Sequence, residues 1–445
     1  MPPLFLFLRL TKCCSNGIIC TNDICAVPSG RLEIIMAIYY IDNMNGDNAL
    51  DGLSPKCARK DYTDISLVSG DTVLFKRGSF YRDKLHAKEE VAYGAYGEGE
   101  LPTFCGSCDV SLPEDWEETE TENVWKCVKP MVGDVGNIAF NGDECTATFR
   151  WNKEELCGQG DFYDERIVVG DRIEEKTMGL GLYMYSVGNP ASVYSHIEAI
   201  SYNTRQLVVL KEGMTFDSLR FINSGVHGMA GQGNNITVRN CVFENIGGCA
   251  WSHPLKIRFG NGFEIWHRGN DILIENCFFK NVYDSCVTHQ GPGELTEPTR
   301  NFICRGCKFD TYGMAAFEYR DKLPIDSSFT DNVCLNAGCG FAMLGEELPR
   351  LSEIWPQPMG HHIFMWRIDH GTEGGDLVLK NNYFGEAPVG AAIYSIISPE
   401  AEAQVTLDNN KYTKNDILLN RWGGVNYNDL EAYKQATGQD KNSTY

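Results

Sequence analysis

The chain has 445 residues, of which 43% are hydrophobic and 22% are charged, a composition typical of a folded protein rather than a disordered one. Acidic residues outnumber basic residues by 60 to 39, which gives a formal net charge of −21. This charge disfavours nucleic acid as a partner, because nucleic-acid binding requires lysine and arginine side chains to neutralise phosphates. The sequence also contains no apolar run of roughly 18 residues, so it predicts no membrane span.

The first 35 residues lack the pattern of the rest of the chain. Residues 2–8 (PPLFLFL) are apolar, but no basic segment precedes this run and no clear cleavage site follows it. A regular pattern begins only at Met36. We therefore predict that residues 1–35 are an upstream extension or a mis-called start outside the fold. A degenerate secretion signal is the alternative.

The next two segments, residues 36–111 and 112–210, differ in regularity. Within the first, Asp71–Phe75 (DTVLF) alternates as a strand does, and the following KRG predicts a turn. Residues 112–210 interrupt the pattern with segments such as WEETETENVWKC and LYMYSVGNPASVYSHIEA. We predict that the first segment forms the N-terminal coils of the fold and that the second is an inserted β-rich segment.

An internal repeat runs through residues 211–425. Each copy has a short alternating strand, a corner residue that is usually asparagine, and an aromatic or apolar residue three positions after the corner. The copies are Asn240-Cys-Val-Phe243, Asn276-Cys-Phe-Phe279, Gly306-Cys-Lys-Phe309, Asn332-Val-Cys-Leu335, Asn381-Asn-Tyr-Phe384 and Asn409-Asn-Lys-Tyr412.

The repeat predicts an all-β solenoid, specifically a right-handed parallel β-helix. One strand cannot bury its apolar face alone, whereas stacked coils bury a continuous core. Corner asparagines tolerate the left-handed conformation and can bond their side-chain amides to the next coil. A leucine-rich repeat would need a leucine frame that is missing, and helical repeats would show a 3.6-residue period. Residues 426–445 add a short amphipathic helix and tail, which would cover the open end of the solenoid.

Several segments resemble known proteins. The opening YYIDNMNGDNALDGLSP, then GDTVLFKRGSFYR and YGAYGEGELP, resembles the start of bacterial right-handed β-helix carbohydrate-active enzymes. The segments QGDFYD, LYMYSVGNPA, GNGFEIW and YDSCVTHQG are similar to the branch that contains glycoside hydrolase family 141. The resemblance implies a pectate-lyase-like solenoid acting on carbohydrate. Because this architecture supports hydrolases, lyases and epimerases, it does not by itself assign catalytic residues.

The 18 cysteines favour free thiols over a disulfide framework. Several recur at equivalent repeat positions, where a small apolar thiol packs well. Free thiols indicate a reducing compartment, so we expect a cytoplasmic protein, with secretion as the alternative. The pairs Cys105–Cys108 and Cys304–Cys307 have zinc-like spacing, but no histidine pair accompanies them, and we predict no metal.

Counting forward from each corner predicts which residues face inward. The residues eleven positions after the corners are all apolar: Met229, Val287, Phe317, Met343 and Ala392. Ile265 joins this set if residues 250–260 form a loop. Side chains alternate along a strand, so the neighbours of this set should face outward. The predicted outward residues are Gly228, Ala230, Glu264, Trp266, Cys286, Thr288, Ala316, Glu318, Ala342 and Leu344.

Two glutamates on this outward face suggest catalysis. Carboxyl groups can protonate a glycosidic oxygen and activate water, and an aromatic ring can pack on a sugar. Rungs are about 4.8 Å apart, so Glu264 and Glu318, two rungs apart, approach the spacing of an inverting glycosidase. Asp284 precedes the intervening strand and could raise the pKa of a neighbouring carboxyl group. The alternative is that all three carboxylates are solvated surface residues.

The remaining site residues are expected to bind substrate. The predicted set is His227, Arg258, Trp266, His289, Gln290, Tyr319, Arg320 and His361, the last from the insertion between the fourth and fifth repeats. A salt bridge with Glu318 is the alternative for Arg320. The preferred function is a glycoside hydrolase acting on a plant or host oligosaccharide without a cofactor. The alternatives are a polysaccharide lyase whose acidic cluster binds Ca²⁺, and a glycan-binding solenoid without activity.

Overall fold

The structure is a computed structural model. It describes the backbone of residues 10–12, 19–21, 36–131, 133–142, 144–166, 168–169, 172–173, 181–202, 205–267, 269–290, 297–343 and 359–445. The predicted extension, residues 1–35, lies outside these ranges except for β1 (Leu10–Lys12) and β2 (Ile19–Thr21), which pair antiparallel. In the described part of the chain, no helix has the length and apolar character needed to cross a membrane.

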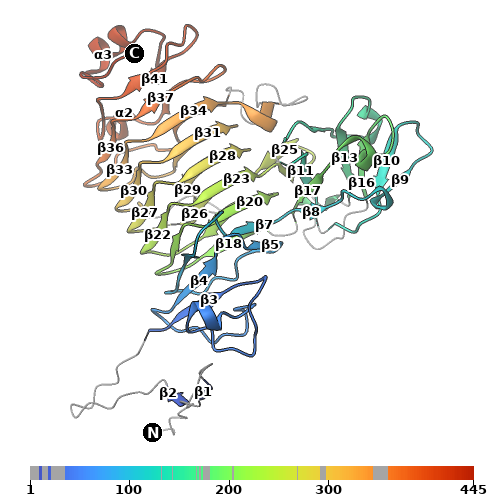
Figure 1. Ribbon diagram of the computed structural model, residues 1–445. Helices are drawn as coiled ribbons and strands as arrows, with labels where there is room; N and C mark the ends of the chain where they lie inside the picture. Colours follow the sequence, from blue (N-terminus) through green and yellow to red (C-terminus); the bar gives the residue numbers. More distant parts are fainter. Residues whose placement is uncertain are drawn as a thin grey trace, which may run out of the picture.

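Three long parallel sheets form the body of the molecule (Figure 1). Sheet 1 contains β3 (Ile38–Ile41), β4 (Thr72–Lys76), β6 (Ala92–Tyr96), β19 (Thr215–Asp217), β22 (Ile236–Arg239), β27 (Ile272–Glu275), β30 (Phe302–Arg305), β33 (Ser327–Thr330), β36 (Leu377–Lys380) and β39 (Val405–Asp408). Sheet 2 contains β5 (Phe80–Tyr81), β7 (Thr103–Cys105), β20 (Arg220–Ser224), β23 (Val242–Ile246), β28 (Phe278–Val282), β31 (Lys308–Tyr312), β34 (Val333–Ala337), β37 (Tyr383–Phe384) and β40 (Lys411–Tyr412).

Sheet 3 completes each coil. It contains β18 (Gln206–Leu210), β21 (His227–Gly231), β26 (Phe263–Ile265), β29 (Ser285–His289), β32 (Ala315–Arg320), β35 (His361–Trp366), β38 (Ile393–Ile396), β41 (Asn420–Trp422) and the antiparallel β42 (Val425–Tyr427). Successive strands enter sheets 1, 2 and 3 in turn, as β27, β28 and β29 do. Crossovers between parallel strands are right-handed. The prediction of a right-handed parallel β-helix is confirmed.

Aromatic rings and corner asparagines hold the coils together. Phe243 and Phe279 stack with ring centroids 4.6 Å apart, and Phe279 and Phe309 follow at 5.2 Å. The corner residues Asn240 and Asn276 have φ of 54° and 52°, as the left-handed conformation requires. The predicted inward column of aromatics and the predicted corner conformation are therefore both present.

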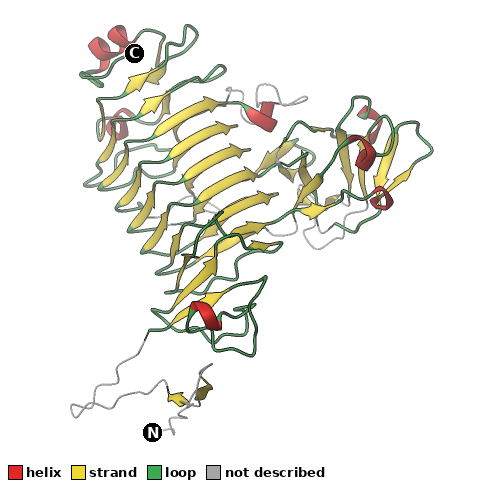
Figure 2. Ribbon diagram, viewed as in Figure 1, coloured by secondary structure: helices red, strands yellow, loops and turns green. Residues whose placement is uncertain are grey.

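In the first coils, the part of the chain that connects sheet 2 to sheet 3 forms a separate lobe, which lies beside the solenoid in Figures 1 and 2. Its strands are β8 (Cys108–Asp109), β9 (Trp116–Glu118), β10 (Val124–Cys127), β11 (Val135–Phe140), β12 (Thr148–Phe149), β13 (Asp161–Glu165), β14 (Val168–Val169), β15 (Arg172–Ile173), β16 (Gly181–Tyr185) and β17 (Ile197–Ser201). The lobe has its own buried cluster, which includes Phe149 and Phe162. The predicted insert, 112–210, extends too far in one respect, because β18 already belongs to sheet 3.

Short helices and one hairpin complete the described structure. They are η1 (Pro55–Cys57), η2 (Pro113–Asp115), η3 (Lys153–Glu155), η4 (Gly340–Met343), α1 (Pro190–Val193), α2 (Pro399–Glu402), α3 (Leu430–Thr437) and the hairpin of β24 (Cys249–Ser252) and β25 (Ile257–Phe259). Helix α3 lies at the C-terminal end of the stack and buries Leu430 and Tyr433. Cys57 is disulfide-bonded, so the prediction of free thiols is wrong there, whereas the other described cysteines from residue 105 onward are free.

Candidate functional site

The outer face of sheet 3 carries a column of side chains in direct register. The pairings place Ala230 opposite Glu264, Glu264 opposite Thr288, and Thr288 opposite Glu318. Phe364 and Tyr394 continue the column on the next two rungs. The structure thus places Glu264 and Glu318 two rungs apart in one column, with Thr288 between them and no diagonal offset.

Five of the six predicted inward residues belong to the hydrophobic core, but only Met229, Val287 and Phe317 lie at the predicted register position. The observed set is Met229, Phe263, Val287, Phe317, Ile363 and Ile393. Ile265 faces inward but lies one alternation further along its strand. Met343 lies in η4 rather than on a strand, and β35 supplies this rung instead. Ala392 lies one position before Ile393 on the last of these rungs.

A break in strand alternation corrects part of the predicted outer face. Cys286 and Ala316, expected to face outward, belong to the core together with Val287 and Phe317. Two consecutive residues of β29 and of β32 therefore face inward. Ser285, the residue before this pair, instead directs its hydroxyl group toward Glu318, with Oγ 3.3 Å from Oε2.

Glu264 is buried, with 6% of its surface exposed, and three side chains contact its carboxyl group. Asn261 Nδ2 donates to Oε2 at 2.7 Å, and Trp266 Nε1 donates to Oε1 at 2.6 Å. His227 Nδ1 lies 3.2 Å from Oε2. Burial is the largest influence on this carboxyl group and raises its pKa, because the charged form is poorly solvated.

His227 adds a neutral imidazole to the same rung. Burial, with a smaller contribution from the charge of Arg205, lowers the pKa of His227 to about 3. The ring of Phe259, from β25, packs against the imidazole edge-on at 5.6 Å between centroids. At neutral pH, His227 is therefore a neutral hydrogen-bonding group beside Glu264 rather than a counter-charge.

Glu318 has an environment that parallels that of Glu264. Only 2% of its surface is exposed, and Trp366 Nε1 donates to Oε1 at 2.7 Å. Burial raises the pKa of this carboxyl group, and the charge of Arg320 acts in the opposite direction. Each glutamate thus has one indole N–H donor and a pKa shifted toward the neutral range.

Asn261 connects the two glutamates through hydrogen bonds. Its amide donates to Glu264, and its Oδ1 accepts from the backbone N–H of Ser285 at 2.9 Å. The Ser285 hydroxyl then reaches Glu318. Neither Asn261, Ser285 nor Trp366 was predicted as a site residue. The signal for Asn261 was its place in the quoted GNGFEIW segment, three positions before Glu264.

Asp284 lies at the corner that precedes β29, and 9% of its surface is exposed. Its negative charge raises the pKa of both Glu264 and Glu318, although less than burial does. A third carboxylate therefore lies within electrostatic range of the pair, as the sequence predicted. Its contribution favours the protonated form of a neighbouring carboxyl group.

A second outward row borders this column. Trp266 and Gln290 are half-buried, and Arg320 hydrogen-bonds to the side-chain oxygen of Gln290. The guanidinium group of Arg320 lies 4.8 Å from the ring centroid of Trp366. Arg320 also pairs with Asp321, with Nε and Oδ2 3.5 Å apart. Arg320 therefore forms a salt bridge, as the alternative prediction proposed, but its partner is Asp321 rather than Glu318.

His289 and Tyr319 require a correction, because both side chains lie inside the solenoid. They share a register position with the buried Ile265. Burial lowers the pKa of His289 to about 3, and among the described residues neither of its ring nitrogens has a hydrogen-bond partner. Both residues lie in the C-terminal halves of their strands, and their side chains belong to the core. They therefore cannot contact a ligand on the outer face.

Arg258 has a structural role instead of the predicted one. It is buried and donates to the backbone oxygens of Gly248 and Gly136, each at 2.5 Å. Its guanidinium group packs on the rings of Phe149 and Tyr283, at 4.5 and 4.6 Å from their centroids. Arg258 therefore joins the inserted lobe to the solenoid.

His361 is the first residue of β35, so the prediction that it belongs to an inserted loop is wrong. The rung above Glu318 begins with this histidine. Its ring stacks on Tyr394 at 4.2 Å between centroids, and Nδ1 accepts from the backbone of Ala391 at 3.0 Å. His361 thus forms part of an aromatic floor that continues from the carboxyl pair toward the C-terminal coils.

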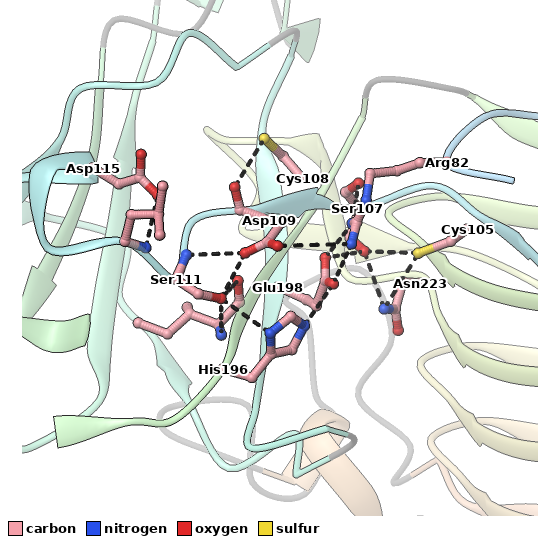
Figure 3. Close-up of polar contacts among 12 residues, drawn as sticks. Arg82, Cys105, Ser107, Cys108, Asp109, Ser111, Asp115, His196, Glu198 and Asn223 are labelled. Carbon is pink, nitrogen blue, oxygen red and sulfur yellow. Dashed lines mark hydrogen bonds and ion pairs between the residues drawn. The ribbon is translucent and has the colours of Figure 1, made fainter. Parts of the chain in front are cut away.

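A second cluster of ionisable groups lies where the lobe meets the solenoid (Figure 3). Asp109, His196 and Glu198 bring possible metal-binding atoms within 4.8 Å of one another. However, Arg82 binds both oxygens of Glu198, at 2.7 and 2.8 Å, and Ser107 donates to the same carboxylate at 2.8 Å. Burial opposes ionisation of Glu198, but the bonds from Arg82 and Ser107 prevail and lower its pKa. The cluster is therefore explained as an ion-pair network that anchors the lobe.

Comparisons with known proteins support the fold. The family described as the right-handed β-helix region matches residues 180–347, which include the carboxyl pair. No curated protein is significantly similar to the chain in sequence.

Several solved structures share the architecture at low sequence identity. A complex of XylC with xylose aligns with a TM-score of 0.50 and 13% identity, over 86% of this chain and 62% of that one. The lacto-N-biosidase of family GH136 from Eubacterium ramulus aligns at 0.47 and 14%, over 92% and 66%. The pectate lyase Pel9A aligns at 0.42 and 14%, over 92% and 77%. The chain spans less than two thirds of the length of the first two structures.

Proposed function

We propose that the protein is a glycoside hydrolase in which Glu264 and Glu318 are the acid and base. The observation that carries this proposal is their placement in one outward column with matched environments. Each is buried, each accepts an indole N–H bond, and each has a pKa raised by burial. Solvated surface carboxylates do not have these properties, and a general acid requires a raised pKa.

The spacing of the pair supports hydrolysis with inversion. Two rungs separate the backbones by about 9.6 Å, and flexible side chains can shorten the distance between the carboxyl groups. An inverting glycosidase needs roughly 6.5–9.5 Å, because a water molecule must fit between the base and the sugar. One carboxylic acid would protonate the leaving oxygen, while the other, as carboxylate, takes a proton from the attacking water.

The neighbouring groups support substrate binding at the same place. Trp266 is half-buried and supplies an indole ring of the kind that packs on the C–H face of a sugar. The half-buried Gln290 can hydrogen-bond to a sugar hydroxyl group. XylC, which shares the architecture, was solved in complex with xylose, and this is consistent with a sugar as the ligand.

The lyase alternative finds less support in the geometry. A lyase of the predicted kind needs carboxylate oxygens gathered around Ca²⁺. Among the described residues, Asp109, His196 and Glu198 bring three possible metal-binding groups within 4.8 Å of one another, of which two are carboxylates, whereas Glu264, Asp284 and Glu318 form no such set. The hydrolase therefore remains the preferred function.

Product chemistry tests the proposal. The full-length protein is incubated with a panel of plant and host oligosaccharides, with and without chelator, while reducing ends and the absorbance of unsaturated uronates are followed. Chelator-insensitive release of reducing ends without that absorbance supports hydrolysis. Formation of the unsaturated product, or its loss with chelator, contradicts it.

Substitution of the pair tests the site. Glu264→Gln and Glu318→Gln are each expected to lower kcat by about 10²–10⁴-fold, because each removes a proton-transfer group. Glu275→Gln is the matched control, since Glu275 lies on sheet 1 in an ion pair with the exposed Arg305. Full activity in both site variants would show that Glu264 and Glu318 are not the acid and the base.

A further inference from the structure

Three arginines lie on the faces of the two tryptophans that contact the glutamates. The guanidinium carbon of Arg205 lies 5.4 Å from the ring centroid of Trp266. Those of Arg320 and Arg367 lie 4.8 and 5.6 Å from the ring centroid of Trp366. We call Arg205, Arg320 and Arg367 the arginine rim.

The rim is positively charged within a strongly acidic protein. Arg320 and Arg367 both pair with Asp321, at 3.5 and 3.2 Å, so two positive charges meet one negative charge beside Trp366. Arg205 adds a further positive charge beside Trp266. The net charge of the whole chain is −21, so a group of three arginines at one site runs against the overall composition.

The field of the rim reaches the carboxyl pair. The charge of Arg320 lowers the pKa of both Glu264 and Glu318, and the charge of Arg205 lowers that of His227. Burial has the larger effect on all three groups. The charge of Asp284 acts in the opposite direction and outweighs that of Arg320 at Glu264, so the guanidinium groups of the rim themselves, rather than a positive field at the carboxyl pair, would attract an anion.

The rim is accessible and has suitable chemistry. Arg205 and Arg367 are exposed, and 19% of the Arg320 side chain is exposed. A guanidinium group that lies flat on an aromatic ring still presents N–H donors at its edge. These donors match the two oxygens of a carboxylate or sulfate group.

From these contacts we infer that the substrate is an acidic saccharide whose carboxylate or sulfate group binds to the arginine rim. This inference rests on the proposed function and narrows its substrate class. Because each tryptophan joins an arginine to a catalytic carboxyl group, the anionic group would lie on a sugar next to the bond that is cleaved. A net charge of −21 alone would favour a neutral glycan, so the arginines of the rim would supply the attraction for the anionic group.

Binding measurements test the inference. Calorimetry is performed on the Glu318→Gln protein, which we expect to bind without turnover. The probes are uronic-acid oligosaccharides, each paired with its carboxyl-reduced neutral form, and sulfated oligosaccharides paired with their desulfated forms. We expect acidic probes of one class to bind at least about tenfold more tightly than their neutral partners, with an advantage that falls as salt increases. The class that shows the advantage distinguishes carboxylate from sulfate.

Rim variants locate the effect. Arg205→Gln and Arg367→Gln, each made in the Glu318→Gln background, should weaken binding of the acidic probe about tenfold and leave the neutral probe unchanged. Arg305→Gln, on sheet 1, is the control and should change neither. If no acidic probe binds more tightly than its neutral partner, or if the rim variants do not reduce the difference, the inference is overturned.

This outcome is separable from the fate of the hydrolase proposal. Hydrolysis of neutral glycans without a preference for acidic probes would contradict the rim subsite and support the hydrolase. An acidic probe could instead bind tightly through the rim and be converted by the wild-type protein to an unsaturated product. That result would support the subsite and contradict the hydrolase.

Discussion

Trp366 donates its indole N–H to Oε1 of Glu318 at 2.7 Å, across 48 residues of sequence. The bond joins adjacent rungs of sheet 3, and Trp266, which directly follows β26, makes the equivalent bond to Glu264 within one rung. A donor fixed by packing holds a carboxyl group in one orientation, which a proton-transfer reaction needs.

Removing the donor beside Glu318 should impair catalysis more than folding. Trp366→Phe keeps an aromatic ring but loses the N–H group, and a hydrogen bond to a charged group contributes about 1.5–3 kcal/mol. We expect kcat to fall at least about tenfold, measured with the substrate identified in the product assay. Trp125→Phe is the control, because Trp125 makes a comparable bond to the Ser186 oxygen within the lobe, at 3.1 Å. Equal effects of the two changes would contradict a role for Trp366 in catalysis.

The pH dependence of activity should respond to Arg320. A nearby positive charge favours an ionised carboxylate, so Arg320 holds the pKa of Glu264 and Glu318 below the level that burial alone would set. Arg320→Gln removes this charge and raises both pKa values. The limbs of the kcat/KM profile that belong to these groups should therefore move to higher pH. A profile that moves to lower pH, or an equal movement in Arg305→Gln, would argue against this electrostatic link.

The glutamate pair should cost the protein stability at high pH. In the unfolded chain these groups ionise near the ordinary glutamate pKa of 4.5, whereas burial raises their pKa in the folded state. Below the unfolded pKa both states are protonated, and as the pH rises through the folded pKa the fold must bury negative charge. Glu264→Gln and Glu318→Gln should therefore raise the Tm relative to wild type at pH 8 and have little effect at pH 4. The opposite order would show that the carboxylates are stabilised when charged.

Arg258 should affect stability and the attachment of the lobe. Its guanidinium group is buried and donates to two backbone oxygens, so Arg258→Met leaves those oxygens without this donor. We expect the free energy of unfolding to fall by about 3 kcal/mol, measured by denaturant titration. The KM of protein that remains folded should change little, since Arg258 does not lie on the outer face of sheet 3. A large rise in KM at unchanged stability would restore the predicted substrate-binding role.

The fold was predictable because its determinants repeat. Asn240, Asn276 and the phenylalanines that follow them carry the same information at each corner, so an error at one copy is corrected by the others. The outward position of Glu264 and Glu318 also followed from alternation along the strands.

The details of the site depended on features that occur once. The break in alternation at Cys286 arises from packing between rungs, and a two-residue period cannot show it. Counting failed at Met343 because η4 and a long connection precede β35. His289 reads as a candidate ligand in any linear pattern, and only the register with Ile265 places it in the core. Asn261 was missed because its link to Glu318 runs through Ser285, which belongs to the neighbouring coil.

The rung that carries Thr288 has a consequence for how this architecture can change its chemistry. Strand spacing in a solenoid is fixed by backbone hydrogen bonds, so the distance between two carboxyl groups in one column is quantised in steps of about 4.8 Å. Deletion of the single coil between Glu264 and Glu318 would place them on adjacent rungs, near the roughly 5–5.5 Å of a retaining enzyme. If the two glutamates are the acid and the base as proposed, gain or loss of one coil is thus a discrete route between the two stereochemical outcomes, without any change in the identity of these residues.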